Sequence, residues 1–197
     1  MISLINNRSR FEIDNLNRKL IHIISSFVII LFPYFLNIWQ IITISVLFSF
    51  IFLISKIKGF LPIINRVKRV SWGEIFYPLG VMISAILFLP QNDIKAFQFG
   101  VLILGLSDAM ANIIGDMFGS IKVEFPWSKK SLEGSLAFFI TSLVLFAIFT
   151  SSSFFLGNIF LILLASFLLT VSEFFLFFGV DNLILPSLAA YLFLYIS

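Results

Sequence analysis

A carboxylate and a carboxamide lie on one face of an apolar segment near the middle of the chain. Asp108, Asn112, Gly115 and Gly119 are spaced at four, three and four residues, so they share one side of a helix. An aspartate inside a membrane helix costs about 3 kcal/mol and usually marks function. Its carboxylate and the neighbouring amide are suitable oxygen ligands for a divalent cation. A glycine-mediated helix contact is the alternative, although it explains the glycines and not the aspartate.

A basic segment follows this helix. It contains Lys122, then Lys129 and Lys130 directly before Ser131, which is placed to cap the next helix. The free N–H groups and the positive dipole end of a helix start form an anion site. The two adjacent lysines therefore favour a phosphate cradle, with Lys122 near it. A basic loop that only marks a membrane surface is the alternative interpretation.

Other polar side chains lie near the ends of apolar segments. Glu173 stands close to the end of one such segment, and Asp181 and Asn182 begin the next. Helix capping is the simplest role for Asp181, and it leaves one carboxylate oxygen available to a metal. Three further polar residues also lie near the ends of apolar segments. Arg18 and His22 are spaced at i and i+4, and Glu74 is a carboxylate close to Trp72.

Composition requires these residues to be positioned by membrane helices. The chain of 197 residues is 60% hydrophobic and only 12% charged, against about 45–50% and about 25% in globular proteins. We expect a single all-α domain over 1–197, a polytopic helical bundle of about seven spans whose residues 1–15 form a cytoplasmic N-terminal segment. With no cysteine and one histidine, thiolate chemistry and histidine-rich metal sites are excluded. The predicted spans lie near 16–33, 35–55, 74–90, 95–116, 134–155, 158–178 and 182–197.

Charge distribution sets the predicted orientation. Only Lys95 among the thirteen basic residues falls on the far side of seven alternating spans, so we place the N-terminus in the cytoplasm and the C-terminus outside. All acids except Asp93 lie at or towards the same ends, which indicates a site open to the cytosol. No polar path continues across the bundle, which argues against transport. The other twelve basic residues are Arg8, Arg10, Arg18, Lys19, Lys56, Lys58, Arg66, Lys68, Arg69, Lys122, Lys129 and Lys130.

Taken together, these residues resemble the dolichol kinase and phytol kinase family of CTP-dependent lipid kinases. Four ordered blocks carry the resemblance over nearly the whole chain. They are Arg18-Lys19-x-x-His22; Trp72-Gly73-Glu74 with Tyr77-Pro78-Leu79-Gly80; Ser107-Asp108 through Lys130-Ser131-Leu132-Glu133-Gly134-Ser135; and Glu173 with Gly179-Val180-Asp181-Asn182-Leu183.

Two positions depart from the family pattern. Asn15 stands where the family often has an acid, and Asp116 stands where a basic residue is common. The second change removes one phosphate contact or adds a metal ligand. The segment from Lys129 to Gly134 is also similar to one in CDP-diacylglycerol synthases. Those enzymes end in a His-Gly-Gly and Asp-Arg-x-Asp signature that this chain replaces with Gly-Val-Asp-Asn-Leu, which favours the kinase.

The resemblance implies transfer of the γ-phosphoryl group of CTP to the hydroxyl of a membrane isoprenoid alcohol. Asp108 and Asp181, with Asp116 as a further ligand, would hold Mg²⁺, and Asp108 is also expected in catalysis. Glu173 or Glu74 would accept the alcohol proton. The residues expected to contact nucleotide or phosphate are Arg18, Lys19, His22, Asn112, Gly115, Lys122, Lys129, Lys130, Ser131, Glu133, Gly134 and Asn182.

Three alternatives remain open at this point. A cytidylyltransferase that makes a CDP-lipid would use the same metal and nucleotide but attack the α-phosphate. A diacylglycerol kinase would use a different acceptor, and a non-catalytic membrane protein would use the polar face for binding or gating. The expected partners are CTP, a lipid alcohol and the bilayer, with no nucleic acid, and the sequence leaves a homo-oligomer open.

Overall fold

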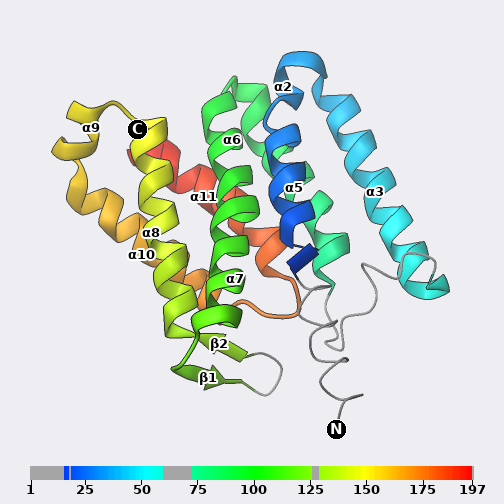
Figure 1. Cartoon of the computed structure of the whole chain (residues 1–197). Helices are drawn as coiled ribbons and strands as arrows, with labels where there is room; N and C mark the ends of the chain where they lie inside the picture. Colours follow the sequence, from blue (N-terminus) through cyan, green and yellow to red (C-terminus); the bar gives the residue numbers. More distant parts are fainter. Residues whose placement is uncertain (1–15, 18, 60–71, 126–128, 197) are drawn as a thin grey trace, which may run out of the picture.

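The computed structural model describes residues 16–17, 19–59, 72–125 and 129–196, which form a bundle of apolar helices (Figure 1). Four helices in these ranges are long and apolar enough to cross a membrane. Three shorter apolar helices accompany them, so each predicted apolar run contains a helix. The number of crossings and their orientation stay predictions. The four are Ile38–Lys58, Gly73–Gln91, Ile94–Phe118 and Leu132–Phe149; the shorter ones are Lys19–Phe35, Ile159–Phe175 and Asp181–Ile196.

The helices have the following bounds. The segment Lys19–Phe35 ends in α2 (Phe32–Phe35), and α3 spans Ile38–Lys58. The central elements are α5 (Gly73–Phe88), η1 (Leu89–Gln91), α6 (Ile94–Leu102), η2 (Ile103–Ser107) and α7 (Asp108–Phe118). The last elements are α8 (Leu132–Phe149), α9 (Ser152–Gly157), α10 (Ile159–Phe175) and α11 (Asp181–Ile196).

A short two-stranded hairpin, which was not predicted, adds to the predicted helical bundle. Strand β1 (Lys122–Glu124) pairs antiparallel with β2 (Lys129–Ser131), between α7 and α8. Glu124 lies opposite Lys129, and their exposed side chains form an ion pair across the ladder. Strands of three residues are too short for a hydrophobic alternation to be recognised, so the sequence predicts only a basic segment here.

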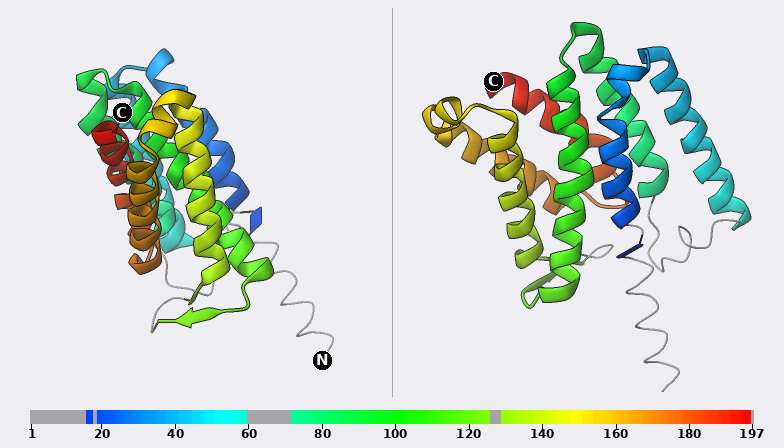
Figure 2. Two further views of the ribbon diagram at one scale, coloured as in Figure 1. Left: turned by 90° about the vertical axis from the view of Figure 1, so that its left-hand side faces the viewer. Right: turned by 45° about the horizontal axis from the view of Figure 1, so that its top comes forward.

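The core brings α5, α6 and α11 together, with α8 packed against α7 and α10 (Figures 1 and 2). Phe99 of α6 lies at its centre, with ring centroids 4.5 Å from Phe146 and 4.9 Å from Phe193. All three rings are almost fully buried. Helix α3 packs on α5 and stands at the edge of the bundle (Figure 1).

Glycines allow α11 to approach the central helices closely. A Cβ atom at Gly80 would lie 2.0 Å from the backbone oxygen of Asn182, and one at Gly100 would lie 2.0 Å from that of Pro186. Backbone atoms cannot move aside as a flexible side chain can. Both positions therefore require glycine: Gly80 holds the start of α11 against α5, and Gly100 holds α11 at Pro186 against α6.

We expect Gly80→Ala to lower the melting temperature of the purified protein by several degrees, because overpacking a helix contact costs about 1–3 kcal/mol. The measurement is thermal unfolding in detergent. Gly157→Ala is the matched control, since nothing lies within 4 Å of a Cβ at that helical position. Equal melting temperatures for the two variants would contradict the close packing of α11 on α5.

Candidate active site

A buried ion pair joins the first helix to α7. The Lys19 ammonium lies 2.8 Å from Oδ2 of Asp108, and the two side chains are 8% and 1% exposed. The Asn112 amide donates to Oδ1 of the same carboxylate at 3.0 Å and to the Asp108 backbone oxygen at 2.7 Å. The prediction that Asp108 and Asn112 share a face is confirmed, and Asp108 is held from two sides.

A second ion pair joins β2 to α10. The Lys130 ammonium contacts Oε1 of Glu173, and these side chains are 14% and 2% exposed. Neighbouring residues of a strand point to opposite faces. Lys130 therefore points into the bundle, whereas the Lys129 side chain is 67% exposed and pairs with Glu124.

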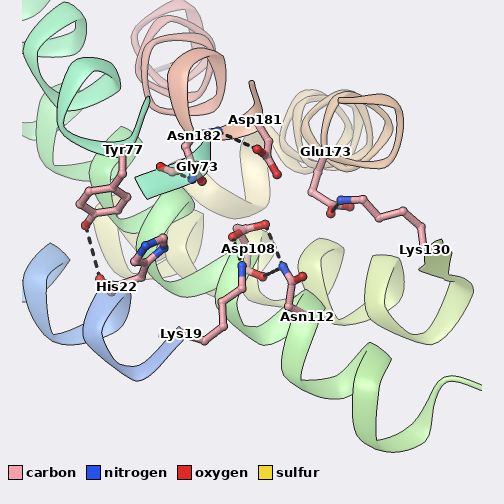
Figure 3. Close-up of polar contacts among 10 residues, drawn as sticks. All are labelled: Lys19, His22, Gly73, Tyr77, Asp108, Asn112, Lys130, Glu173, Asp181 and Asn182. Carbon is pink, nitrogen blue, oxygen red and sulfur yellow. Dashed lines mark hydrogen bonds and ion pairs between the residues drawn. The ribbon is translucent and has the colours of Figure 1, made fainter. Parts of the chain in front are cut away.

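The two pairs form one charge cluster, defined by Lys19, Asp108, Lys130, Glu173 and Asp181. Figure 3 shows the carboxylates of Asp108 and Asp181 turned towards each other, with the second ion pair beside them. Burial lowers the pKa of Lys130, but the charges of Glu173, Asp181 and Asp108 outweigh it and raise that pKa. Because its pKa is raised above an ordinary value of about 10.4, Lys130 stays protonated through the neutral pH range.

Three carboxylates face two ammonium groups in this cluster, so one negative charge is left over among the described residues. One oxygen, Oε2 of Glu173, is buried and accepts no hydrogen bond from the described part of the chain. Unpaired charge and an unused buried acceptor are costly in an apolar bundle. The charge cluster is therefore suited to a cationic ligand or to a group that brings its own proton.

The carboxylates suit Mg²⁺ only as a partial protein site. No group of three acidic or histidine side chains is arranged around a metal position in the described ranges. Magnesium, however, is commonly held by one or two carboxylates together with substrate phosphates, and Asp108 and Asp181 fit that requirement. Asp116 is exposed and lies eight residues further along α7, about 12 Å along the axis. The structure does not bring it to the charge cluster.

A π-helical turn precedes Asp108 and was not foreseen. η2 (Ile103–Ser107) separates α6 from α7 and is mostly buried. Such turns are often found at functional sites. A Cβ at Gly105 would lie 2.2 Å from Ser26, so the first helix packs directly against this turn. Lys19 lies about two helical turns before Ser26 on the first helix, so this close packing at Gly105 places Lys19 beside Asp108. A single sequence carries no periodic signal for one π turn.

Polar contacts extend the charge cluster towards α5. The rings of His22 and Tyr77 lie 4.6 Å apart, and the Tyr77 hydroxyl donates to the His22 backbone oxygen at 3.3 Å. Ser25 donates to the same hydroxyl oxygen at 3.1 Å. The Asn182 amide donates to the backbone oxygen of Gly73 at 2.8 Å, which ties α11 to the start of α5. Tyr77 was missed as a site residue, although it stands three residues after Glu74.

Several residues predicted to contact phosphate also have structural partners within the chain. Ser131 accepts from the Gly134 N–H at 3.1 Å, which confirms the predicted cap of α8. Glu133 accepts from Ser120 and from the Ile121 N–H, so it anchors the loop before β1. A Cβ at Gly115 would lie 3.6 Å from the Cα of Gly134, so these glycines bring α7 and α8 together. Lys122 is exposed on β1, Glu74 is half-buried in the first turn of α5, and Arg18 lies outside the described residues.

Three known proteins are similar to this chain. An uncharacterised protein of Methanocaldococcus jannaschii is 34% identical over 140 residues, which cover 71% of this chain and 66% of that protein. The phytol kinase of Synechocystis is 26% identical over 186 residues, covering 91% and 78%. Phytol kinase 1, chloroplastic, of Arabidopsis thaliana is 32% identical over 76 residues, covering 39% and 24%.

The chain thus spans about two thirds of the length of the archaeal relative and a quarter of that of the plant protein. No family model and no solved structure matches it. These distant similarities support the phytol kinase family, and with it a membrane-bound phosphotransferase.

Proposed function

We propose that the chain is a CTP-dependent kinase that phosphorylates the hydroxyl of an isoprenoid alcohol at the cytoplasmic membrane face. The observation that carries this proposal is the buried charge cluster at one end of an apolar helical bundle. Phosphoryl transfer mainly requires that phosphates be positioned and their charge neutralised. Two buried lysines and the cap of α8 supply positive groups, and two facing carboxylates supply metal ligands. CTP as the donor follows from the resemblance to the CTP-dependent family.

Asp108 and Asp181 would hold Mg²⁺, with Asn112 keeping the Asp108 carboxylate in place. The ion would neutralise phosphate charge as the leaving group departs. Lys130 and Lys19 would leave their carboxylate partners in part to contact phosphate oxygens. An ammonium can serve both partners because it has three donors.

Glu173 or Glu74 is the proposed proton acceptor. Oε2 of Glu173 is unused by the described residues and lies in the charge cluster, whereas Glu74 lies in the first turn of α5. The alcohol oxygen forms a bond to the γ-phosphorus of CTP while the bond from that phosphorus to the bridging oxygen breaks. The alcohol proton moves to the accepting carboxylate, Glu173 or Glu74, and CDP leaves with the bond electrons. The products are a lipid monophosphate and CDP.

The experiment that tests this function uses the purified protein with Mg²⁺ and a panel of phytol, geranylgeraniol, dolichol, diacylglycerol and phosphatidate. Parallel reactions contain CTP labelled at the γ or the α phosphate, or γ-labelled ATP. We expect label in an isoprenoid lipid from γ-labelled CTP alone. Label from α-labelled CTP would mean a cytidylyltransferase, and label in diacylglycerol would mean a diacylglycerol kinase. Folded protein that neither binds CTP nor labels any lipid would be a non-catalytic protein.

A further inference from the structure

A cavity of about 310 Å³ lies between the segment Lys19–Phe35, α3 and α5. Along the first helix its lining runs from Ile21 to Phe32, twelve residues that span about 16 Å of helix axis. This length is about half of a hydrocarbon core of about 30 Å. The cavity is therefore an elongated space aligned with the helices, and no step proposed above uses its apolar part.

The walls of the cavity are mostly apolar, and most of the polar side chains lie at one end. Val28, Ile29, Phe32, Ile44 and Val81 line it away from the charge cluster, with Ser45 as the polar exception on α3. The polar end is formed by residues from the first two turns of two helices: His22, Ser25, Glu74 and Tyr77. This distribution matches a ligand with one long apolar chain and one polar head.

The cavity reaches the outer surface of the bundle. Ile21, Val28 and Phe48 line it and are about half exposed, at 47%, 52% and 50%. These side chains are carried by the first helix and by α3, the helix at the edge of the bundle (Figure 1). A chain dissolved in lipid can thus enter sideways, without passing through water.

The polar end of the cavity adjoins the charge cluster. His22 lines the cavity and also interacts electrostatically with Asp108. Figure 3 shows the His22 side chain between Tyr77 and the Lys19–Asp108 pair. A hydroxyl placed beside His22 and Glu74 is therefore next to the residues proposed to bind phosphate and metal.

We propose that this cavity binds the hydrocarbon chain of the acceptor, and that the acceptor is a single-chain alcohol with its hydroxyl at the His22 and Glu74 end. The inference rests on the proposed kinase function and deepens it. A volume of about 310 Å³ is at the lower end of ligand cavities, which span about 300–1,000 Å³. One narrow apolar space suits one chain and disfavours diacylglycerol, which would have to leave its second chain outside.

The test uses a long-chain isoprenoid alcohol that carries a photoreactive diazirine in its tail, added to the full-length protein in lipid nanodiscs without CTP. Mass spectrometry then locates the labelled peptides. We expect labelling in Lys19–Phe35, α3 and α5, and at least a tenfold decrease when phytol is added in excess. Excess diacylglycerol should decrease it less than twofold. Labelling of α8 or α10 instead, or equal competition by diacylglycerol, would overturn the inference.

Matched substitutions on α3 supply a kinetic test. Ile44→Trp fills the cavity, whereas Leu47→Trp places the same side chain on the exposed side of α3. We expect Ile44→Trp to raise the KM for phytol at least tenfold while the KM for CTP changes less than twofold. Leu47→Trp should change neither constant. An unchanged KM for phytol in Ile44→Trp would contradict the binding of the alcohol in this cavity but not the proposed kinase function. Wild-type protein that phosphorylates no lipid would contradict the proposed function itself.

Discussion

Asp108→Asn should decrease phosphoryl transfer about 1000-fold. Asparagine keeps the size of the side chain and its contact with Asn112, but it removes the charge that faces Asp181 and pairs with Lys19. Removing one preorganised electrostatic group from an active site typically costs about 100- to 1000-fold in rate. The measurement is the rate of lipid labelling from γ-labelled CTP at saturating Mg²⁺, together with the melting temperature.

Loss of folding must be separated from loss of chemistry in this variant. Breaking a buried ion pair strands the partner charge and costs about 3–5 kcal/mol, whereas removing both charges is often neutral. We therefore expect the double variant Lys19→Met/Asp108→Asn to regain most of the melting temperature and to stay inactive. A double variant that transfers phosphate at the wild-type rate would show that the Lys19–Asp108 pair only stabilises the fold.

Local features of the site were predictable from sequence periodicity. The spacing of Asp108 and Asn112 placed them on one helix face, where the structure has a hydrogen bond of 3.0 Å between them. The cap at Ser131 followed from its position at the start of an apolar run, directly after Lys129 and Lys130. Apolar run length likewise located the helices, since burial in lipid requires about 20 consecutive apolar residues.

Long-range pairing was not predictable in the same way. Lys19 and Asp108 are 89 residues apart, and Lys130 and Glu173 are 43 residues apart. Which lysine meets which acid depends on helix packing, and here on glycine contacts and one π turn that carry no periodic signal. Asp116 was likewise not separable from Asp108 by sequence, yet it is exposed and lies about two helical turns further along α7.

The two adjacent lysines of the hairpin, Lys129 and Lys130, show most clearly what the sequence could not predict. Lys129 and Lys130 are neighbours in a basic segment, so the sequence predicts phosphate binding equally for both. The strand separates them, because its alternation turns Lys130 into the bundle and Lys129 towards the surface. A loop, as the sequence suggested, would not have distinguished their roles.

Lys130→Met should therefore decrease kcat/KM for CTP about 100-fold, whereas Lys129→Met should change it less than threefold. Both substitutions remove one positive charge from the same segment, so an effect of overall surface charge would be equal in the two variants. Lys129 forms an exposed ion pair with Glu124, and such solvent-screened pairs contribute little to stability. Lys130 lies among Glu173, Asp181 and Asp108, where a phosphate would be bound.

The measurement is steady-state kinetics in detergent with CTP varied at saturating alcohol. Equal losses in the two variants would mean that the hairpin attracts nucleotide through its net charge and that Lys130 has no direct phosphate contact.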